Sequence, residues 1–103
     1  MENRKLFEAI ALRKCLDATY NRSAVKLAPH ILYTRHGELF VDAVTVERDG
    51  KPPREIKLGT FKIAGLKDME VEERSFEPAM VFDPRDEKYA GETVFAIELD
   101  QAA

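Results

Sequence analysis

The run Leu39-Phe40-Val41-Asp42-Ala43-Val44-Thr45-Val46 decides the fold class of this chain. Almost all of its residues favour β-structure, and apolar side chains occur on both of its alternating faces. A strand that is apolar on both faces belongs in the middle of a sheet or in a closed barrel, where both faces are covered. We therefore predict that residues 39–46 form a central strand.

Two further strands are predicted on the N-terminal side of this run. Residues 16–20 alternate between apolar and polar side chains and end in a turn at residues 21–23. Residues 25–33 place apolar side chains on one strand face, but Pro29 interrupts them. Because proline cannot donate a hydrogen bond to a neighbouring strand, Pro29 should lie at a bulge, at an edge or at a strand start. A turn at His36-Gly37 then leads into the central run.

One amphipathic helix is predicted before these strands, over residues 4–14. Phe7, Ile10 and Ala11 follow helical spacing, and Asn3 can cap the first turn with its side chain. A helix this short is marginally stable alone, so its apolar face should pack against the rest of the chain.

The apolar alternation changes phase between residues 56 and 63, after a hairpin-like loop at residues 49–53. One extra residue would restore the phase, so we predict a β-bulge or a sharp bend at Gly59-Thr60. Such a bend would help a small sheet to curl.

The C-terminal part of the chain predicts shorter elements. We expect a 3₁₀ turn near residues 64–66, a strand around residues 69–71, one helical turn within residues 86–90 and a last strand at residues 93–99. The last strand can pair with an edge of its own sheet or with a second subunit. Five short strands after one helix indicate a mainly β fold of the α+β class, a small and strongly bent sheet or barrel with a C-terminal extension.

Length and composition limit the class of protein. A chain of 103 residues, with 45% hydrophobic and 34% charged residues, fits one globular domain rather than a disordered segment. Its single cysteine, Cys15, cannot form an internal disulfide and sits among apolar residues, so we expect it to be buried. One cysteine and two distant histidines give no recognised zinc spacing. The N-terminus lacks the apolar core of a signal peptide and no apolar run is long enough to span a membrane, so we expect a cytoplasmic protein without membrane contacts.

Charge is unevenly distributed along the chain. Residues 1–67 hold 13 lysines and arginines against 8 aspartates and glutamates, whereas residues 68–103 hold 3 against 11. A basic body with an acidic tail is compatible with an anion site guarded by the tail, and equally with an ordinary solvated surface.

The order of motifs resembles that of the WYL domain of bacterial transcriptional regulators, over about residues 6–78. A helix is followed by a strand ending in Tyr20-Asn21, by Pro29-His30, by Leu39-Phe40-Val41 and by residues 58–66 with the sequence LGTFKIAGL. Leu39-Phe40-Val41 stands where that family has its Trp-Tyr-Leu signature. The resemblance implies an Sm-like, SH3-type small barrel of five strands.

The same resemblance implies a function and a division of the chain. Residues 1–78 would form the helix and the barrel, and residues 79–103 an acidic extension that packs on the barrel or on a partner. The module would sense a nucleotide or a single nucleic-acid strand and would act in transcription regulation, here as a stand-alone version. Where the family has an Asp-Arg pair this chain has Ala64-Gly65, which leaves a second possibility open. In that case the chain is a protein–protein or homodimeric adaptor, dimerising through the C-terminal strand.

Candidate ligand-binding residues are cations that can hold phosphate and aromatic rings on which bases can stack. The cations are Lys26, Arg35, Arg54, Lys57 and Lys62, and the rings are those of Tyr20, Tyr33 and Phe40. No Ser/His/Asp or Cys/His spacing indicates catalysis, so we expect no enzyme and no cofactor. His36 precedes a turn glycine and should be exposed, whereas His30 should be a hydrogen-bonded structural residue.

Overall fold

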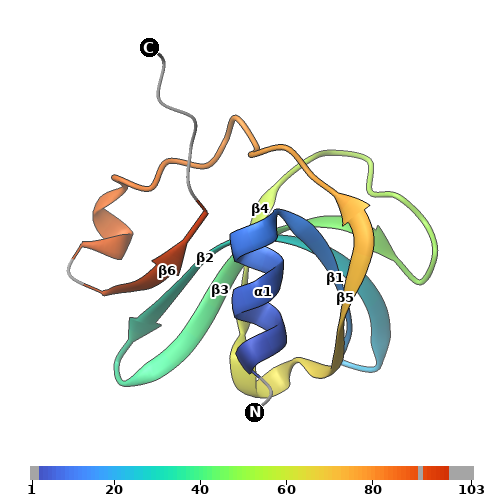
Figure 1. Ribbon diagram of the computed structural model, residues 1–103, viewed down its shortest axis with the longest axis horizontal. Helices are drawn as coiled ribbons and strands as arrows, with labels where there is room; N and C mark the ends of the chain where they lie inside the picture. Colours follow the sequence, from blue (N-terminus) through green and yellow to red (C-terminus); the bar gives the residue numbers. More distant parts are fainter. Residues whose placement is uncertain (1–2, 91, 98–103) are drawn as a thin grey trace.

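The computed structural model describes residues 3–90 and 92–97. One helix, α1 (Asn3–Leu12), precedes a curved antiparallel sheet (Figure 1). The strands are β1 (Lys14–Tyr20), β2 (Ser23–Arg35), β3 (Glu38–Arg48), β4 (Leu58–Lys62), β5 (Lys67–Ser75) and β6 (Thr93–Ala96), and the 3₁₀ helices are η1 (Ile63–Gly65) and η2 (Glu87–Tyr89). The predicted class, mainly β with one N-terminal helix, is confirmed.

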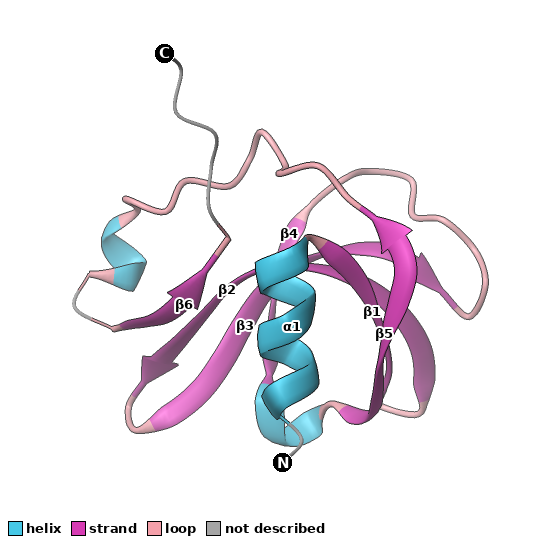
Figure 2. Cartoon of the chain, viewed as in Figure 1, coloured by secondary structure: helices cyan, strands magenta, loops and turns pink. Residues whose placement is uncertain are grey.

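The sheet is open, and its main path runs in the order β4-β3-β2-β1-β5. β6 is a sixth strand that pairs with β2 away from this path. β3 lies between β2 and β4, which confirms that residues 39–46 form a central strand. Figure 2 shows the sheet curving around α1, which contacts β1, β2, β5 and β6.

The long strand β2 changes partner at Pro29. Its first part pairs with β1 as far as Leu27, and its last part pairs with β6 from Ile31 onward. Pro29 therefore falls in the gap between the two partners, where a missing N–H breaks no ladder. The pairing with β3 shifts register between Pro29 and Ile31, so of the three predicted placements of the proline, at a bulge, at an edge or at a strand start, the structure supports the bulge.

The predicted bulge at Gly59-Thr60 is wrong. β3 and β4 pair without interruption from Phe40 opposite Lys62 to Val44 opposite Leu58. The apolar phase changes because Ile56 is not in the strand: it lies in the preceding loop and is 70% exposed. Register shifts occur instead in the pairing of β2 with β3 and of β1 with β5, and irregularities of this kind bend a strand.

The helix and the turns follow the sequence closely. α1 ends at Leu12, two residues earlier than predicted, because Arg13 adopts a positive φ of 55° and the chain enters β1. The predicted turns at residues 64–66 and 86–90 are confirmed as η1 and η2. The last strand pairs within its own sheet, and residues 98–99 of the predicted strand lie outside the described residues.

One core joins the helix, the sheet and the C-terminal segment. Leu6 and Ile10 of α1 are fully buried against the sheet, and Phe82 and Tyr89 from the segment after β5 belong to the same cluster. Cys15 is fully buried as predicted, and burial raises the pKa of its thiol. Within residues 3–90 and 92–97, no helix is long and apolar enough to cross a membrane.

Candidate functional site

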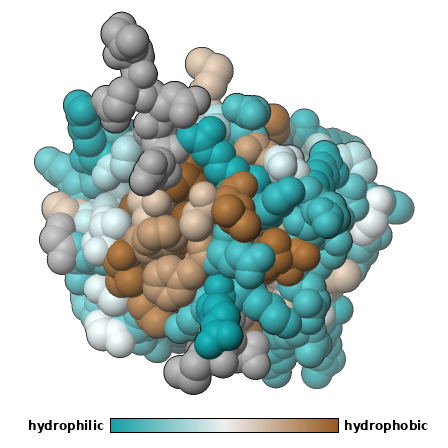
Figure 3. Space-filling model, in the orientation of Figure 1, coloured by the Kyte–Doolittle hydropathy of each residue, from teal (hydrophilic) through white to brown (hydrophobic). Residues whose placement is uncertain are grey.

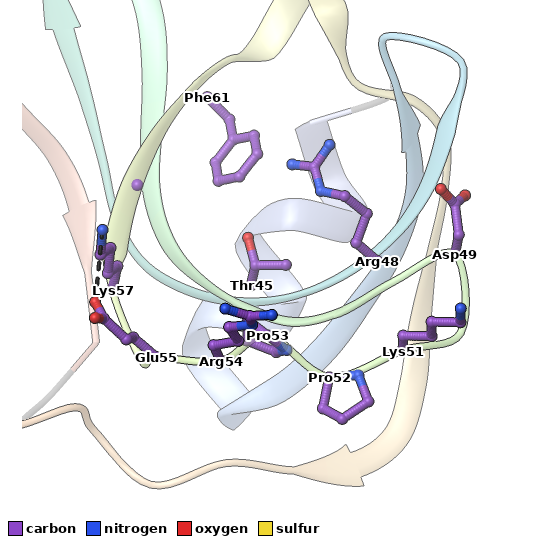
Figure 4. A pocket seen from close by; sticks show the side chains of 11 residues that line it. Thr45, Arg48, Asp49, Lys51, Pro52, Pro53, Arg54, Glu55, Lys57 and Phe61 are labelled. Atoms are coloured by element: carbon purple, nitrogen blue, oxygen red, sulfur yellow. Dashed lines mark ion pairs between the residues drawn. The ribbon is translucent and has the colours of Figure 1, made fainter.

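A cavity lies between the end of β3 and the loop that connects β3 to β4. It has a volume of about 720 Å³, and we call it the loop pocket (Figure 4). Its lining residues are Thr45, Arg48, Asp49, Lys51, Pro52, Pro53, Arg54, Glu55, Lys57, Gly59 and Phe61.

Local sequence explains why the chain leaves this space open. A tight turn closes β3, with two backbone hydrogen bonds between Arg48 and Lys51 and positive φ angles at Asp49 and Gly50. Pro52-Pro53 follows, and because prolines have no N–H the ladder between β3 and β4 cannot continue there. Pairing with β3 resumes only at Leu58, so the chain between the two points stands away from β3.

Four cationic side chains surround the loop pocket: Arg48, Lys51, Arg54 and Lys57. All four residues are exposed. Lys57 forms an ion pair with Glu55 at 3.6 Å, and both side chains are at least 70% exposed, so this pair holds Lys57 only weakly. No ion pair joins the other three cations to a carboxylate within the described part of the chain. The pocket therefore presents several cations that can turn toward an anion.

The inner wall of the loop pocket is apolar and aromatic. Phe61 is only 6% exposed, and its ring meets the ring of Tyr20 edge-on, with 5.1 Å between the centroids. Gly59 keeps the wall beside Phe61 free of a side chain. Figure 4 shows the Phe61 ring and the Arg48 guanidinium group extending into the same space. The pocket thus combines an apolar wall with a cationic rim.

Of the eight residues predicted to bind a ligand, Arg54 and Lys57 line the loop pocket. Tyr20 lies behind it, in contact with Phe61. Lys62 is at the other end of β4, where it pairs with Glu38 at 3.1 Å. The structure therefore does not bring Lys57 and Lys62 to one surface.

The other four predicted residues lie elsewhere. Lys26 is held between two carboxylates, at 2.7 Å from Glu72 and 3.5 Å from Asp17. Arg35 is exposed at the end of β2. The remaining two are aromatic: Tyr33 is fully buried, and its ring stacks on that of Phe40. These positions leave Lys26 and Tyr33 fully engaged within the protein.

Sequence reasoning missed two cations of the loop pocket, Arg48 and Lys51. Both flank the Asp49-Gly50 turn, which marks where β3 ends. The signal that could have found them was the density of cations around a turn followed by two prolines, because such a loop cannot fold flat onto the sheet.

A buried polar cluster was also missed, and Asp42 is at its centre. Asp42 is fully buried, and Tyr33 and Thr60 donate hydrogen bonds to Oδ1 at 2.7 and 2.8 Å. Tyr89 donates to Oδ2, and Lys88 Nζ lies 2.9 Å from the same oxygen. We call these five residues the Asp42 cluster. An aspartate inside the apolar run of residues 39–46 was the signal in the sequence, since a buried charge needs partners.

Burial and hydrogen bonding within the Asp42 cluster shift the pKa values of Asp42 and Tyr89. Burial acts to raise the pKa of Asp42, but the hydrogen bonds from Tyr89, Lys88, Tyr33 and Thr60 outweigh it, and the pKa is lowered. Burial, followed by contact with Asp42, raises the pKa of Tyr89. Both oxygens of Asp42 are occupied, so the cluster joins η2 to the sheet and leaves no carboxylate oxygen without a partner.

A metal site or a known relative could also indicate the function of this chain. Within the described residues, no three His, Cys, Asp or Glu side chains are placed to hold a metal ion. Comparison of the chain with protein-family models, with curated proteins and with solved structures finds no match. The geometry of the loop pocket is therefore the basis for any functional assignment.

Proposed function

We propose that this chain is a regulatory ligand-binding module that holds a nucleotide-like or oligonucleotide anion in the loop pocket. The observation that carries the proposal is the set of four exposed cations around an aromatic wall. A phosphate is held by several converging cations, and an apolar wall suits the body of a base. A volume of about 720 Å³ lies within the range of small-molecule sites.

The overall charge favours a small or single-stranded ligand over duplex DNA. The net charge is −3, so long-range repulsion opposes nonspecific binding to a polyanion. Only local contacts at the pocket can then provide affinity, which selects a ligand that fits inside it.

We also propose that the curved sheet is a divergent Sm-like small barrel of the WYL type, in which β4 and β5 are left unpaired with each other. The order of a helix and five strands, with η1 joining β4 to β5, supports this proposal. In such a domain the ligand would report a regulatory signal, as in transcription regulation.

Ligand binding can be measured by isothermal titration and fluorescence anisotropy at low salt. The probes are a labelled short oligothymidylate, cyclic AMP and AMP. We expect the double variant Arg48→Ala/Arg54→Ala to bind at least tenfold more weakly, because one charge-assisted hydrogen bond contributes about 1.5 kcal/mol, which is about tenfold in affinity. Lys57→Ala should weaken binding less, since Lys57 is one exposed ammonium group.

Lys62→Ala is the matched control for Lys57→Ala, because both lysines flank β4 but only Lys57 lines the pocket. The control should bind as the unmodified chain does. Absence of binding by all three probes, or equal weakening by Lys57→Ala and Lys62→Ala, would remove the loop pocket as the site.

A second candidate function is a homodimeric adaptor, because β6 offers an edge. β6 pairs only with β2 among the described strands, and Val94 on it is 47% exposed. Beside it, Phe7 and Phe95 are half-buried with ring centroids 5.3 Å apart. Figure 3 shows hydrophobic residues gathered on the face of the molecule that carries α1 and β6. A second copy that added its own β6 here would cover this face.

Light scattering over a range of protein concentrations tests the dimer. We expect a rising mean mass for the unmodified chain and a monomer for Val94→Lys, because a lysine charge would be buried at the new interface. Ile56→Lys is the control: it changes an exposed apolar residue of the loop between β3 and β4 and should leave the mass unchanged. A monomer at every concentration contradicts the adaptor.

A further inference from the structure

The segment that follows β5 is fastened to the sheet at two buried titratable groups. We call residues 76–90 and 92–97 the C-terminal strap. Asp42 on β3 holds the strap through Lys88 and Tyr89. His30 on β2 holds it near its beginning, at Ala79. Both holding side chains are fully buried, whereas most of the strap around them is exposed or only half-buried.

The partners of His30 determine where its proton lies. Nδ1 is 2.7 Å from the carbonyl oxygen of Ala28, which can only accept, so Nδ1 carries the hydrogen. Nε2 is 2.9 Å from the backbone N–H of Ala79, which can only donate, so Nε2 is the unprotonated acceptor. His30 is therefore neutral in this structure, as one tautomer.

The surroundings of His30 make this arrangement sensitive to acid. The rings of Phe76 and Phe82, both from the strap, lie with their centroids 5.1 Å from that of His30. A proton on Nε2 would set two N–H groups against each other at Ala79 and would place a charge between aromatic rings. Neither Ala28 nor the rings can take up that proton, so the contact with Ala79 must break.

Few charged groups face His30. Asp42, on the neighbouring strand β3, attracts a positive charge on the imidazole. Glu77, on the strap, lines the same cavity of about 420 Å³ as His30 but is exposed. The other residues lining that cavity, including Val44 of β3 and Ile56 of the loop, are uncharged. Asp42 attracts the charge but cannot act as a hydrogen-bond acceptor in place of Nε2. Both of its carboxylate oxygens already have partners.

We propose that His30 is an acid-sensitive latch: its protonation at Nε2 detaches residues 76–82 from β2, while the Asp42 cluster still holds Lys88 and Tyr89. Detachment uncovers the apolar cavity beside His30, whose outer rim carries Met80 and Val81. Mild acid thus exposes a surface that is covered at neutral pH.

The direction of the titration agrees with the geometry. Burial lowers the pKa of His30 below its ordinary value, and the bond to Ala28 and the charge of Asp42 oppose this effect only in part. Because the opened form binds a proton more readily, the latch holds fully above the ordinary histidine pKa of about 6.5 and weakens as pH falls below it. Asp42 has a lowered pKa, so its contribution is lost only below the ordinary aspartate value of about 3.9. The two fastenings therefore respond in separate pH ranges.

Amide hydrogen exchange, followed residue by residue by NMR at pH 7.5 and 5.5 and corrected for the intrinsic rate, tests the latch. We expect the protection of the Ala79 amide to fall at pH 5.5, by up to about tenfold, since this pH is one unit below the ordinary histidine pKa. The amide of Phe82, which donates to the carbonyl of Ala79, should follow it. The Thr34 amide donates to Glu92, close to the Asp42 cluster, and should keep its protection.

Two variants separate the histidines. His30→Gln keeps a side-chain acceptor for Ala79 but cannot titrate. In this variant the protection of the Ala79 amide should no longer depend on pH. His36→Gln changes the other, exposed histidine and should respond as the unmodified chain does. Equal protection of Ala79 at both pH values in the unmodified chain, or a uniform loss that includes Thr34, overturns the proposal whether or not His30→Gln folds.

Discussion

Replacing Asp42 with alanine should lower the free energy of unfolding by about 3–4 kcal/mol. The change leaves two buried phenol groups, those of Tyr33 and Tyr89, and the Lys88 ammonium group without their common acceptor. Removing one partner of a buried charged pair costs about 3–5 kcal/mol, and Lys88 remains partly hydrated at 33% side-chain exposure, which moderates the loss. Urea unfolding followed by circular dichroism measures the effect.

Asp68→Asn is the control for this prediction. Asp68 is exposed and has a positive φ of 54°, a conformation that asparagine tolerates as well as aspartate does. The free energy of unfolding of Asp68→Asn should stay within about 0.5 kcal/mol of that of the unmodified chain. A loss for Asp42→Ala no larger than that of the control would show that the Asp42 cluster does not hold the strap.

Stability should depend on acid in the direction set by Asp42. Its folded-state pKa is lowered, so its contribution is complete above the ordinary value of about 3.9 and disappears as pH falls through the folded value. The difference in stability between the unmodified chain and Asp42→Ala should therefore shrink in that acid range.

Leu6→Ala should cost about 3 kcal/mol, because Leu6 is fully buried between α1 and the sheet. Leu12→Ala makes the same chemical change in the same helix at a side chain that is 58% exposed, and it should cost less than about 0.5 kcal/mol. Shifts in the urea midpoint at constant slope measure both values. Equal shifts would mean that α1 does not cover the core with the face that the structure assigns to it.

Local sequence patterns predicted most of the fold because they act over a few residues. A run of β-forming residues that is apolar on both faces located β3, and the proline in β2 marked the place of a register shift. The prediction at Gly59-Thr60 failed because Ile56 was counted as a strand residue, although the two prolines before it keep the loop away from β3. Whether an apolar residue is in a strand depends on pairing partners, which alternation alone does not reveal.

The candidate site was harder to predict, because it depends on which charges neutralise each other. Lys26 lies opposite Asp17 in the pairing of β1 with β2, and Glu72 of β5 reaches the same lysine. Strand register brings these three charged side chains together, and the register cannot be read from the sequence. Among the residues that the structure describes, Arg48 and Lys51 have no carboxylate partner of this kind, and they lie where the ladder ends.

The open sheet has a consequence for self-association of this protein. Among the described strands β5 pairs only with β1, and an edge without a partner strand invites aggregation. Charged residues outnumber apolar ones along it, and Glu70 and Glu73 are exposed. Like charges along the β5 edges of two molecules repel each other, so β5 is a poor template for pairing with the same strand of another molecule. The acidic residues of β5 then help to protect this edge against aggregation.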